Sequence, residues 1–278
     1  MPTFATPGPI AATVQVAGAQ VRVTASDRTD TVVLVEPINV ASRSDVKVAN
    51  KTKVDFASGR LSVKTTASGD KNGSVAITID LPAGSSLVTY LAHSGVQADG
   101  SFGDCELHMA SGRVQLDRID ALQATISAGE VVIGHIAGRA DIDGGALAMR
   151  IGEVEGPVGF SSSGGQVWIG HASADLDLGS GSCDFDIDRA GGSVNASTAS
   201  GVIRIGRMTH GQAKLMNGSG NMEVGISEGT AASIDVNSER GAVHTFVSSQ
   251  GDSDPSDDKV MVHARARHGD IIIQPTAC

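Results

Sequence analysis

Three residues whose side chains could bind a metal ion recur at one constant interval along the chain: His135, Glu153 and His171. Imidazole and carboxylate groups are common zinc ligands, but a zinc site needs all of its ligands about 2 Å from one ion. If each 18-residue unit adds one step of about 4.8 Å, the two histidines stand roughly 10 Å apart. We therefore expect no metal site here, and the column predicts a solvent-exposed corner.

Asp141 and Asp177 could serve as the paired carboxylates of a polysaccharide-cleaving enzyme. Gly159 lies midway between them in the same column, so no side chain there can form the wall of a cleft. Units this short also leave no room for the long loops that usually build active-site grooves. The sequence contains no nucleophile elbow, phosphate-binding loop or zinc-protease helix motif. These observations favour a protein that is not an enzyme and holds no cofactor.

Trp168 is the single tryptophan of the chain and shares a column with Arg150, Asp186 and Arg204, again at the same interval. Tryptophan and arginine are enriched among the residues that dominate binding energy in protein interfaces. The column is therefore our candidate partner-binding site. A second interpretation stays open, in which the Trp168 ring simply lies over Arg150 in a cation–π contact.

The elements that position these side chains repeat at the same interval. In each unit two apolar residues flank one variable residue, which is the period-2 pattern of a strand with one buried face. One apolar column runs through Ile133, Ile151, Ile169, Ile187 and Ile205, and it reaches Val224 after one extra residue. A fixed period of this size indicates stacked supersecondary units. We predict an all-β fold, a single-stranded β-helix or β-solenoid with about 18 residues per coil.

Glycines precede the first inward side chain of most units by two residues, and there they predict tight corners that need either positive φ or the absence of a Cβ. They are Gly112, Gly129, Gly165, Gly201, Gly220, Gly241 and Gly269. Leu147 and Cys183 take this place in two units. Those two corners are expected to differ from the others.

The regular register is confined to residues 91–246. Residues 1–90 are expected to form an N-terminal capping region of strands continuous with the solenoid, helped by a run of charged residues from Arg43 to Asp55. Residues 247–278 contain an acidic loop, Asp252 to Asp258, and the strands expected to close the stack. No linker interrupts the chain, so we expect one structural domain with capped ends. Capped ends predict a monomer or small homo-oligomer rather than a filament.

Three segments resemble a known bacterial family: AQVRVTASDRTDTVV (residues 19–33), EVGISEGTAA (223–232) and ARARHGDIII (264–273). Together with the repeats they are similar to a putative-adhesin family of uncharacterised β-strand-repeat proteins. The resemblance implies a β-solenoid fold and an adhesin label. It implies no catalytic residues.

Several features of the sequence concern cellular location. Residues 1–18 contain no Lys or Arg and no apolar core typical of a signal peptide, and no apolar run is long enough to span a membrane. The three cysteines, Cys105, Cys183 and Cys278, are an odd and widely spaced set that favours a reducing compartment over a disulfide framework. We therefore expect a cytoplasmic protein.

The net charge of −10 and an aromatic content of 3% disfavour nucleic acid as a partner. The sequence thus favours a non-enzymatic cytosolic scaffold or binding surface for an unidentified protein or other macromolecule. One alternative is a cell-surface adhesin exported by a route that the sequence does not show. Another is a polysaccharide-active β-helix enzyme.

Overall fold

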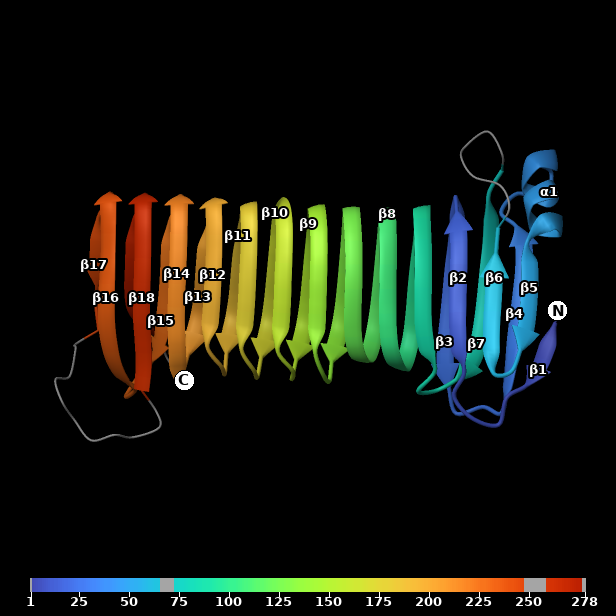
Figure 1. Cartoon of the computed structure of the whole chain (residues 1–278), viewed down its shortest axis with the longest axis horizontal. Helices are drawn as coiled ribbons and strands as arrows, with labels where there is room; N and C mark the ends of the chain where they lie inside the picture. The colour runs from blue at the N-terminus through green and yellow to red at the C-terminus, as the bar shows by residue number, and fades with distance from the viewer. Residues whose placement is uncertain (1, 66–72, 248–258, 277–278) are drawn as a thin grey trace. The chain divides into compact units, whose positions relative to one another are not determined.

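A computed structural model describes residues 2–65, 73–247 and 259–276 (Figure 1). The chain divides into two compact units, Met1–Ala137 and Gly138–Cys278, and each is described by itself. Both consist almost entirely of β-strands, and α1 (Arg43–Lys51) is the one helix among the described residues. That helix is too short and too polar to cross a membrane. The predicted acidic loop and Cys278 lie outside the described residues.

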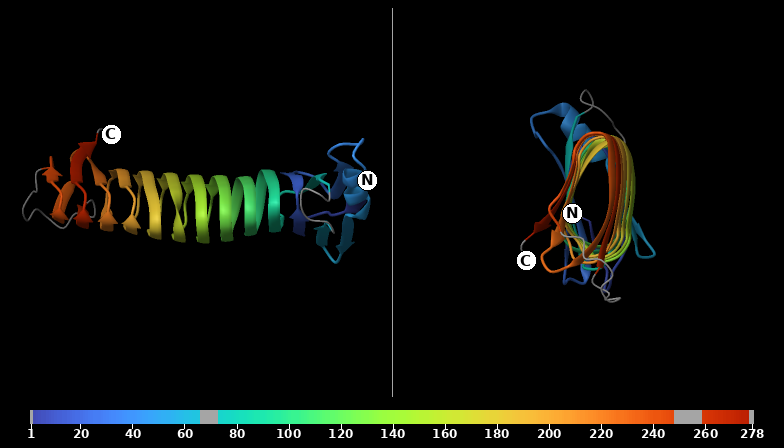
Figure 2. Two further views of the ribbon diagram at one scale, coloured as in Figure 1. Left: turned by 90° about the horizontal axis from the view of Figure 1, so that it is seen from above. Right: turned by 90° about the vertical axis from the view of Figure 1, so that its left-hand side faces the viewer.

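The second unit is a parallel stack of coils. Strands β9 (Ala140–Val154), β10 (Val158–Ala172) and β11 (Leu176–Ala190) each follow most of one coil, and each pairs in parallel with the next at a step of 18. The stack continues with β12 (Val194–Ser200) and β13 (Ile203–Met208), and then at a step of 19 with β14 (Gly211–Ser219) and β15 (Met222–Ser227). Viewed along the axis of this unit, successive coils overlie one another (Figure 2). The predicted β-solenoid and its register are confirmed.

The core of the second unit lies inside the coils. Ile151, Ile169 and Ile187 stand opposite one another in adjacent coils, and all three are 0% exposed. A further buried column was not predicted, and it follows each isoleucine by three residues: Val154, Ala172, Ala190 and Met208. The coils therefore bury more side chains than the period-2 pattern alone indicated.

Most corners have the predicted glycine conformation. Gly165 has a φ of +129°, and an added Cβ there would lie 1.9 Å from the carbonyl oxygen of Leu147. Gly241 meets the prediction in its other form: its φ is outside the left-handed region, but an added Cβ there would lie 2.0 Å from the carbonyl oxygen of Gly269. The corners at Leu147 and Cys183 do differ, because both side chains are buried in the core.

The C-terminal strands are not in sequence order within the stack. β18 (Lys259–His268) pairs with both β14 and β16 (Ala231–Arg240), and β19 (Ile271–Thr276) pairs with both β15 and β17 (Val243–Thr245). The strands that we expected to close the stack therefore lie one coil inside it, and residues 231–245 form the outermost described coil (Figure 1). The expectation was wrong because it assumed that the order of coils follows the order of the chain.

The first unit contains a comparable insertion. β8 (Ser86–Ile136) winds continuously through several coils. β2 (Ala11–Ala17) lies between β8 and β6 (Arg60–Lys64), and β3 (Ala19–Ser26) lies between β8 and β7 (Val75–Pro82). The pairing then turns antiparallel through β4 (Asp30–Pro37), β5 (Lys53–Ala57) and β1 (Thr3–Ala5). These antiparallel strands end the run of parallel coils in this unit.

Helix α1 packs against β4 and β7 and was not predicted from the sequence. Ser42 is its N-cap: the hydroxyl of Ser42 accepts a hydrogen bond from the Asp45 N–H and donates one to the Asp45 carboxylate. Asp45 is 9% exposed, and its carboxylate also accepts hydrogen bonds from the backbone N–H groups of Asn39 (3.0 Å) and Ser74 (3.1 Å). These donors, Ser74 first, lower the pKa of Asp45.

Candidate binding surface

The four residues of the predicted partner-binding site form one row on the outer face of the second unit. Arg150 pairs in register with Trp168, Trp168 with Asp186, and Asp186 with Arg204, one residue per coil. Adjacent members are thus separated by about 4.8 Å of backbone spacing. We call these four residues the outer row. The predicted juxtaposition is correct, and binding by the row remains a prediction.

Trp168 lies flat along its own strand. Its side chain is half-buried, and its ring reaches to 3.0 Å from where a Cβ on Gly170 would stand. The aromatic contacts of the described residues do not include a contact between Trp168 and Arg150, so they give no support to the cation–π interpretation. Gly170 makes room for the indole, which presents a fixed apolar surface beside charged neighbours.

Arg204 is held by carboxylates of the preceding coil. Its guanidinium lies 2.6 Å from the Asp186 carboxylate and 3.5 Å from that of Asp188 (N to O distances). The hydrogen bond to Asp186 is the main reason that the pKa of Arg204 is raised. All three side chains are partly exposed, so the network contributes little to stability. Its effect is to fix the direction of the charges beside Trp168.

A second column of polar residues, the corner column, follows the outer row by three residues in each coil. Glu153, His171, Arg189 and Arg207 occupy it in adjacent coils, and His171 Nδ1 lies 3.4 Å from the Glu153 carboxylate. His135 belongs to the other unit. The described residues contain no group of three His, Cys, Asp or Glu side chains arranged to hold a metal ion.

The two aspartates that could have formed a catalytic pair are both engaged elsewhere. Asp141 forms a two-point ion pair with Arg139, which lowers the pKa of Asp141, whereas Asp177 accepts a hydrogen bond of 2.8 Å from the Asn195 amide. A hollow of about 390 Å³ is lined by Gly159 and Asp177 but not by Asp141. A general acid in glycoside hydrolysis needs a raised pKa. The shift at Asp141 has the opposite direction.

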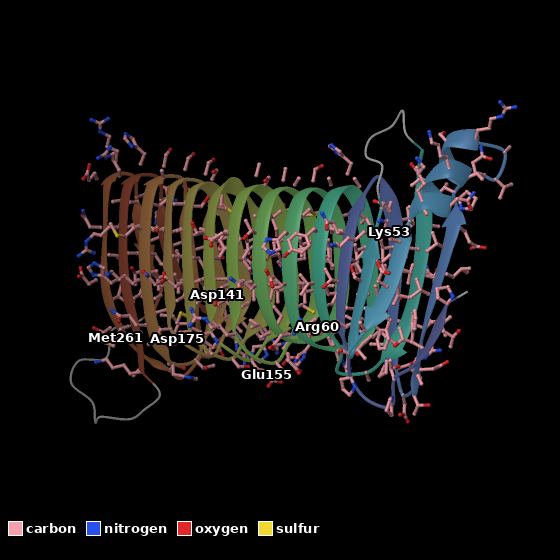
Figure 3. All side chains as sticks on the ribbon, turned by 45° about the vertical axis from the view of Figure 1, so that its right-hand side comes forward. Lys53, Arg60, Asp141, Glu155, Asp175 and Met261 are labelled. Carbon is pink, nitrogen blue, oxygen red and sulfur yellow. The ribbon has the colours of Figure 1, made fainter. Side chains whose placement is uncertain are left out.

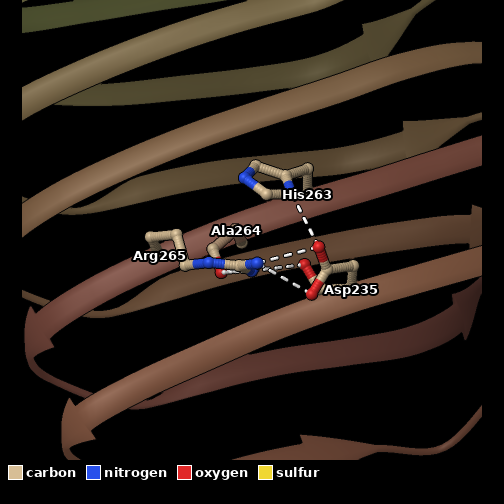
Figure 4. Close-up of polar contacts among 4 residues, drawn as sticks. All are labelled: Asp235, His263, Ala264 and Arg265. Carbon is tan, nitrogen blue, oxygen red and sulfur yellow. Dashed lines mark hydrogen bonds and ion pairs between the residues drawn. The ribbon is translucent and has the colours of Figure 1, made fainter.

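A further charged cluster was missed by the sequence analysis. Asp235 on β16 lies 2.9 Å from His263 Nδ1 and 2.8 Å from the Arg265 guanidinium, both on β18 (Figure 4). Arg265, the larger cause, and His263 lower the pKa of Asp235. The cluster exists because β18 is inserted next to β16. No periodic signal in the sequence reveals that pairing, since the residues are 28 and 30 positions apart and outside the 18-residue register.

A parallel coil with rows of fixed outward side chains defines the protein as a β-solenoid repeat protein. The chain belongs to the Toastrack DUF4097 family, whose model matches residues 11–274. This membership agrees with the resemblance to a putative-adhesin family that the sequence indicated. No curated protein matches the chain.

Solved structures from several bacteria align with this chain at low identity and low TM-score. A putative adhesin from Parabacteroides merdae is 9% identical, with a TM-score of 0.37, over 99% of this chain and 95% of that chain. A putative adhesin from Bacteroides fragilis is 10% identical, with a TM-score of 0.34, over 98% and 95%. A putative lipid binding protein from Parabacteroides distasonis is 10% identical, with a TM-score of 0.38, over 99% and 95%.

Proposed function

We propose that the protein is a non-enzymatic cytoplasmic scaffold that binds a protein or other macromolecule through the outer row. The observation that carries the proposal is the register, which sets Trp168 between Arg150 and the ion-paired Asp186 on consecutive coils. Side chains fixed in this way lose little conformational entropy when a partner binds. Tryptophan and arginine, the two residue types that adjoin here, are also enriched among interface hot spots.

Affinity capture with matched variants tests the proposal. Trp168→Ala removes the proposed anchor, and Lys214→Ala changes an exposed residue on the opposite outer face of the same unit. A hot-spot residue contributes about 2 kcal/mol or more, so Trp168→Ala should weaken partner binding at least about 30-fold. Lys214→Ala should leave the affinity unchanged. Equal capture by both variants would contradict the proposal.

Cell fractionation separates the cytoplasmic scaffold from the alternative of an exported adhesin. The protein, expressed at its native level, should remain in the soluble cytoplasmic fraction or at the inner face of the membrane, protected from protease added to intact cells. Digestion of the protein in intact cells would place the outer row outside the cell and favour the adhesin.

A further inference from the structure

Basic residues are segregated at one end of the first unit. Residues 38–64 contain six Lys or Arg and two Asp, a net charge of +4, although the whole chain carries −10. The other residues therefore carry −14. The positive charge is therefore concentrated in this one segment of an otherwise acidic chain.

Helix α1 presents three of these cations along one side. Arg43, Lys47 and Lys51 follow one another at steps of four residues, which places them in a stripe on the exposed face of the helix. Val48 and Asp45 on the opposite side are 1% and 9% exposed. A helix of nine residues is about 13 Å long, so the stripe follows nearly its whole length.

Two lysines extend the stripe onto the adjoining strands. Lys53, the first residue of β5, is separated from the helix by Thr52 alone (Figure 3). It stands opposite Lys64 on β6 in the antiparallel pair. Both side chains are exposed. These five cations, the two strand lysines and the three on the helix, form no ion pair with any described residue.

This arrangement costs stability. Like charges four residues apart on a helix repel each other, and so do like charges directly opposite in a strand pair. Arg43 also lies in the first turn of α1, where the helix dipole disfavours a cation. A purely structural cap would be more stable with acidic residues at some of these positions. The charge pattern therefore indicates a binding role.

Exposed apolar side chains adjoin the basic stripe. Val40 is 80% exposed and Ile38 is 45% exposed, in the turn that leads into α1. The turn is held in place: the Asn39 side chain accepts a hydrogen bond from the Ala41 N–H (2.9 Å), and the Asn39 N–H donates to the buried Asp45 carboxylate (3.0 Å). Val40 is thus fixed in an outward position at the tip of the turn.

We propose that this basic cap, comprising Arg43, Lys47, Lys51, Lys53 and Lys64 with Ile38 and Val40, docks on the surface of an anionic phospholipid bilayer. Lipid headgroups attract the cations, and the shallow apolar layer beneath them accepts the two aliphatic side chains. A nucleic acid would satisfy the cations but would leave Val40 exposed to water. An anionic bilayer matches both features.

Vesicle binding by the full-length protein tests the proposal. The protein should sediment with vesicles of phosphatidylcholine mixed with phosphatidylglycerol, should not sediment with phosphatidylcholine alone, and should be released by added salt. Each basic residue near an anionic surface contributes about fivefold, so Lys47→Gln with Lys51→Gln should weaken binding about 30-fold. Val40→Ser should weaken it at least about threefold.

The matched control removes the same charge elsewhere. Arg189→Gln with Lys214→Gln neutralises two exposed cations of the second unit and should leave vesicle binding unchanged. Circular dichroism melts confirm that each variant is folded. Equal losses for the two double variants, or no binding of the wild type to anionic vesicles at low salt, would overturn the proposal. So would tighter binding to duplex DNA than to vesicles, accompanied by no effect of Val40→Ser.

Discussion

Replacing Ile169 by alanine tests the 18-residue register at the centre of the second unit. Ile169 is 0% exposed and stands between Ile151 and Ile187 in the adjacent coils. Truncation therefore leaves a cavity bordered by both neighbours, because a strand-paired coil cannot collapse into it. Such a change lowers the free energy of unfolding by about 2–5 kcal/mol. Because the stack is rigid, we expect a loss of about 4 kcal/mol. Urea denaturation of the purified variant measures the loss of unfolding free energy.

Arg150→Ala is the matched control for this experiment. Arg150 is exposed on the outer face of the coil that precedes Ile169, and it forms no ion pair among the described residues. Its truncation should change the unfolding free energy by less than about 0.5 kcal/mol. Arg204→Asp is a poor control despite its outward position, because it would place an acid beside Asp186 and Asp188. Equal losses for Ile169→Ala and Arg150→Ala would refute the assignment of inward and outward columns.

Three further changes test separate parts of the fold. Deleting residues 259–276 removes the strands that pair with β16 and β17. Hydrogen exchange in residues 231–245 should then rise to the rate of unprotected amides, while β10 stays protected. Persistent protection of residues 231–245 would contradict the inserted strand order. Gly165→Ala should lower the free energy of unfolding by more than about 3 kcal/mol, because φ is +129° and the Cβ would meet a carbonyl oxygen at 1.9 Å. Gly95→Ala should be tolerated, because nothing lies within 4 Å of a Cβ there. Similar melting curves for the two variants would refute the corner geometry. Asp45→Asn should destabilise the protein most at neutral pH. Because the folded pKa of Asp45 is lowered, its contribution is present above the unfolded pKa of about 3.9 and is lost as pH falls towards the folded value, so the difference in melting temperature should shrink in acid; a constant difference from pH 7 to pH 3 would contradict this role.

The coils could be predicted from the sequence because their inward residues recur in fixed columns. Ile151, Ile169 and Ile187 show the register directly, and the glycine corners agree with it. The buried column of Val154, Ala172, Ala190 and Met208 was missed because it is out of phase with the alternation of the strand residues before it. Val154 follows Ile151 by three residues, which breaks the period-2 alternation that identifies an inward side chain.

The ends could not be predicted in the same way. Pairing of β18 between β14 and β16 depends on which coils meet in space, and sequence order does not determine this when a longer connection intervenes. The cluster of Asp235, His263 and Arg265 was missed for the same reason. Helix α1 does have a local signal, the Ser42 to Asp45 capping pair, but the valines and lysines that follow were interpreted only as a charged cap.

The outer row could be placed from sequence because it belongs to the regular coils. The columns predicted that Arg150, Trp168, Asp186 and Arg204 are neighbours, and the register confirms this. The sequence could not predict the ion pairs of Arg204 with Asp186 and Asp188, because they depend on side-chain geometry. The same is true of the position of the Trp168 indole over Gly170. Spacing fixes which residues are adjacent, whereas rotamers decide which of them interact.

Site-specific photo-crosslinking in the native host tests the proposed binding surface most directly. A photoreactive tryptophan analogue, which keeps the indole ring, replaces Trp168 in one strain and Lys214 on the opposite outer face in another, and crosslinked species are identified by mass spectrometry. The proposal predicts one dominant crosslinked macromolecule from position 168, at constant stoichiometry, and none from position 214. The same crosslinks from both positions, or none from position 168 under conditions in which the protein is abundant, would contradict it.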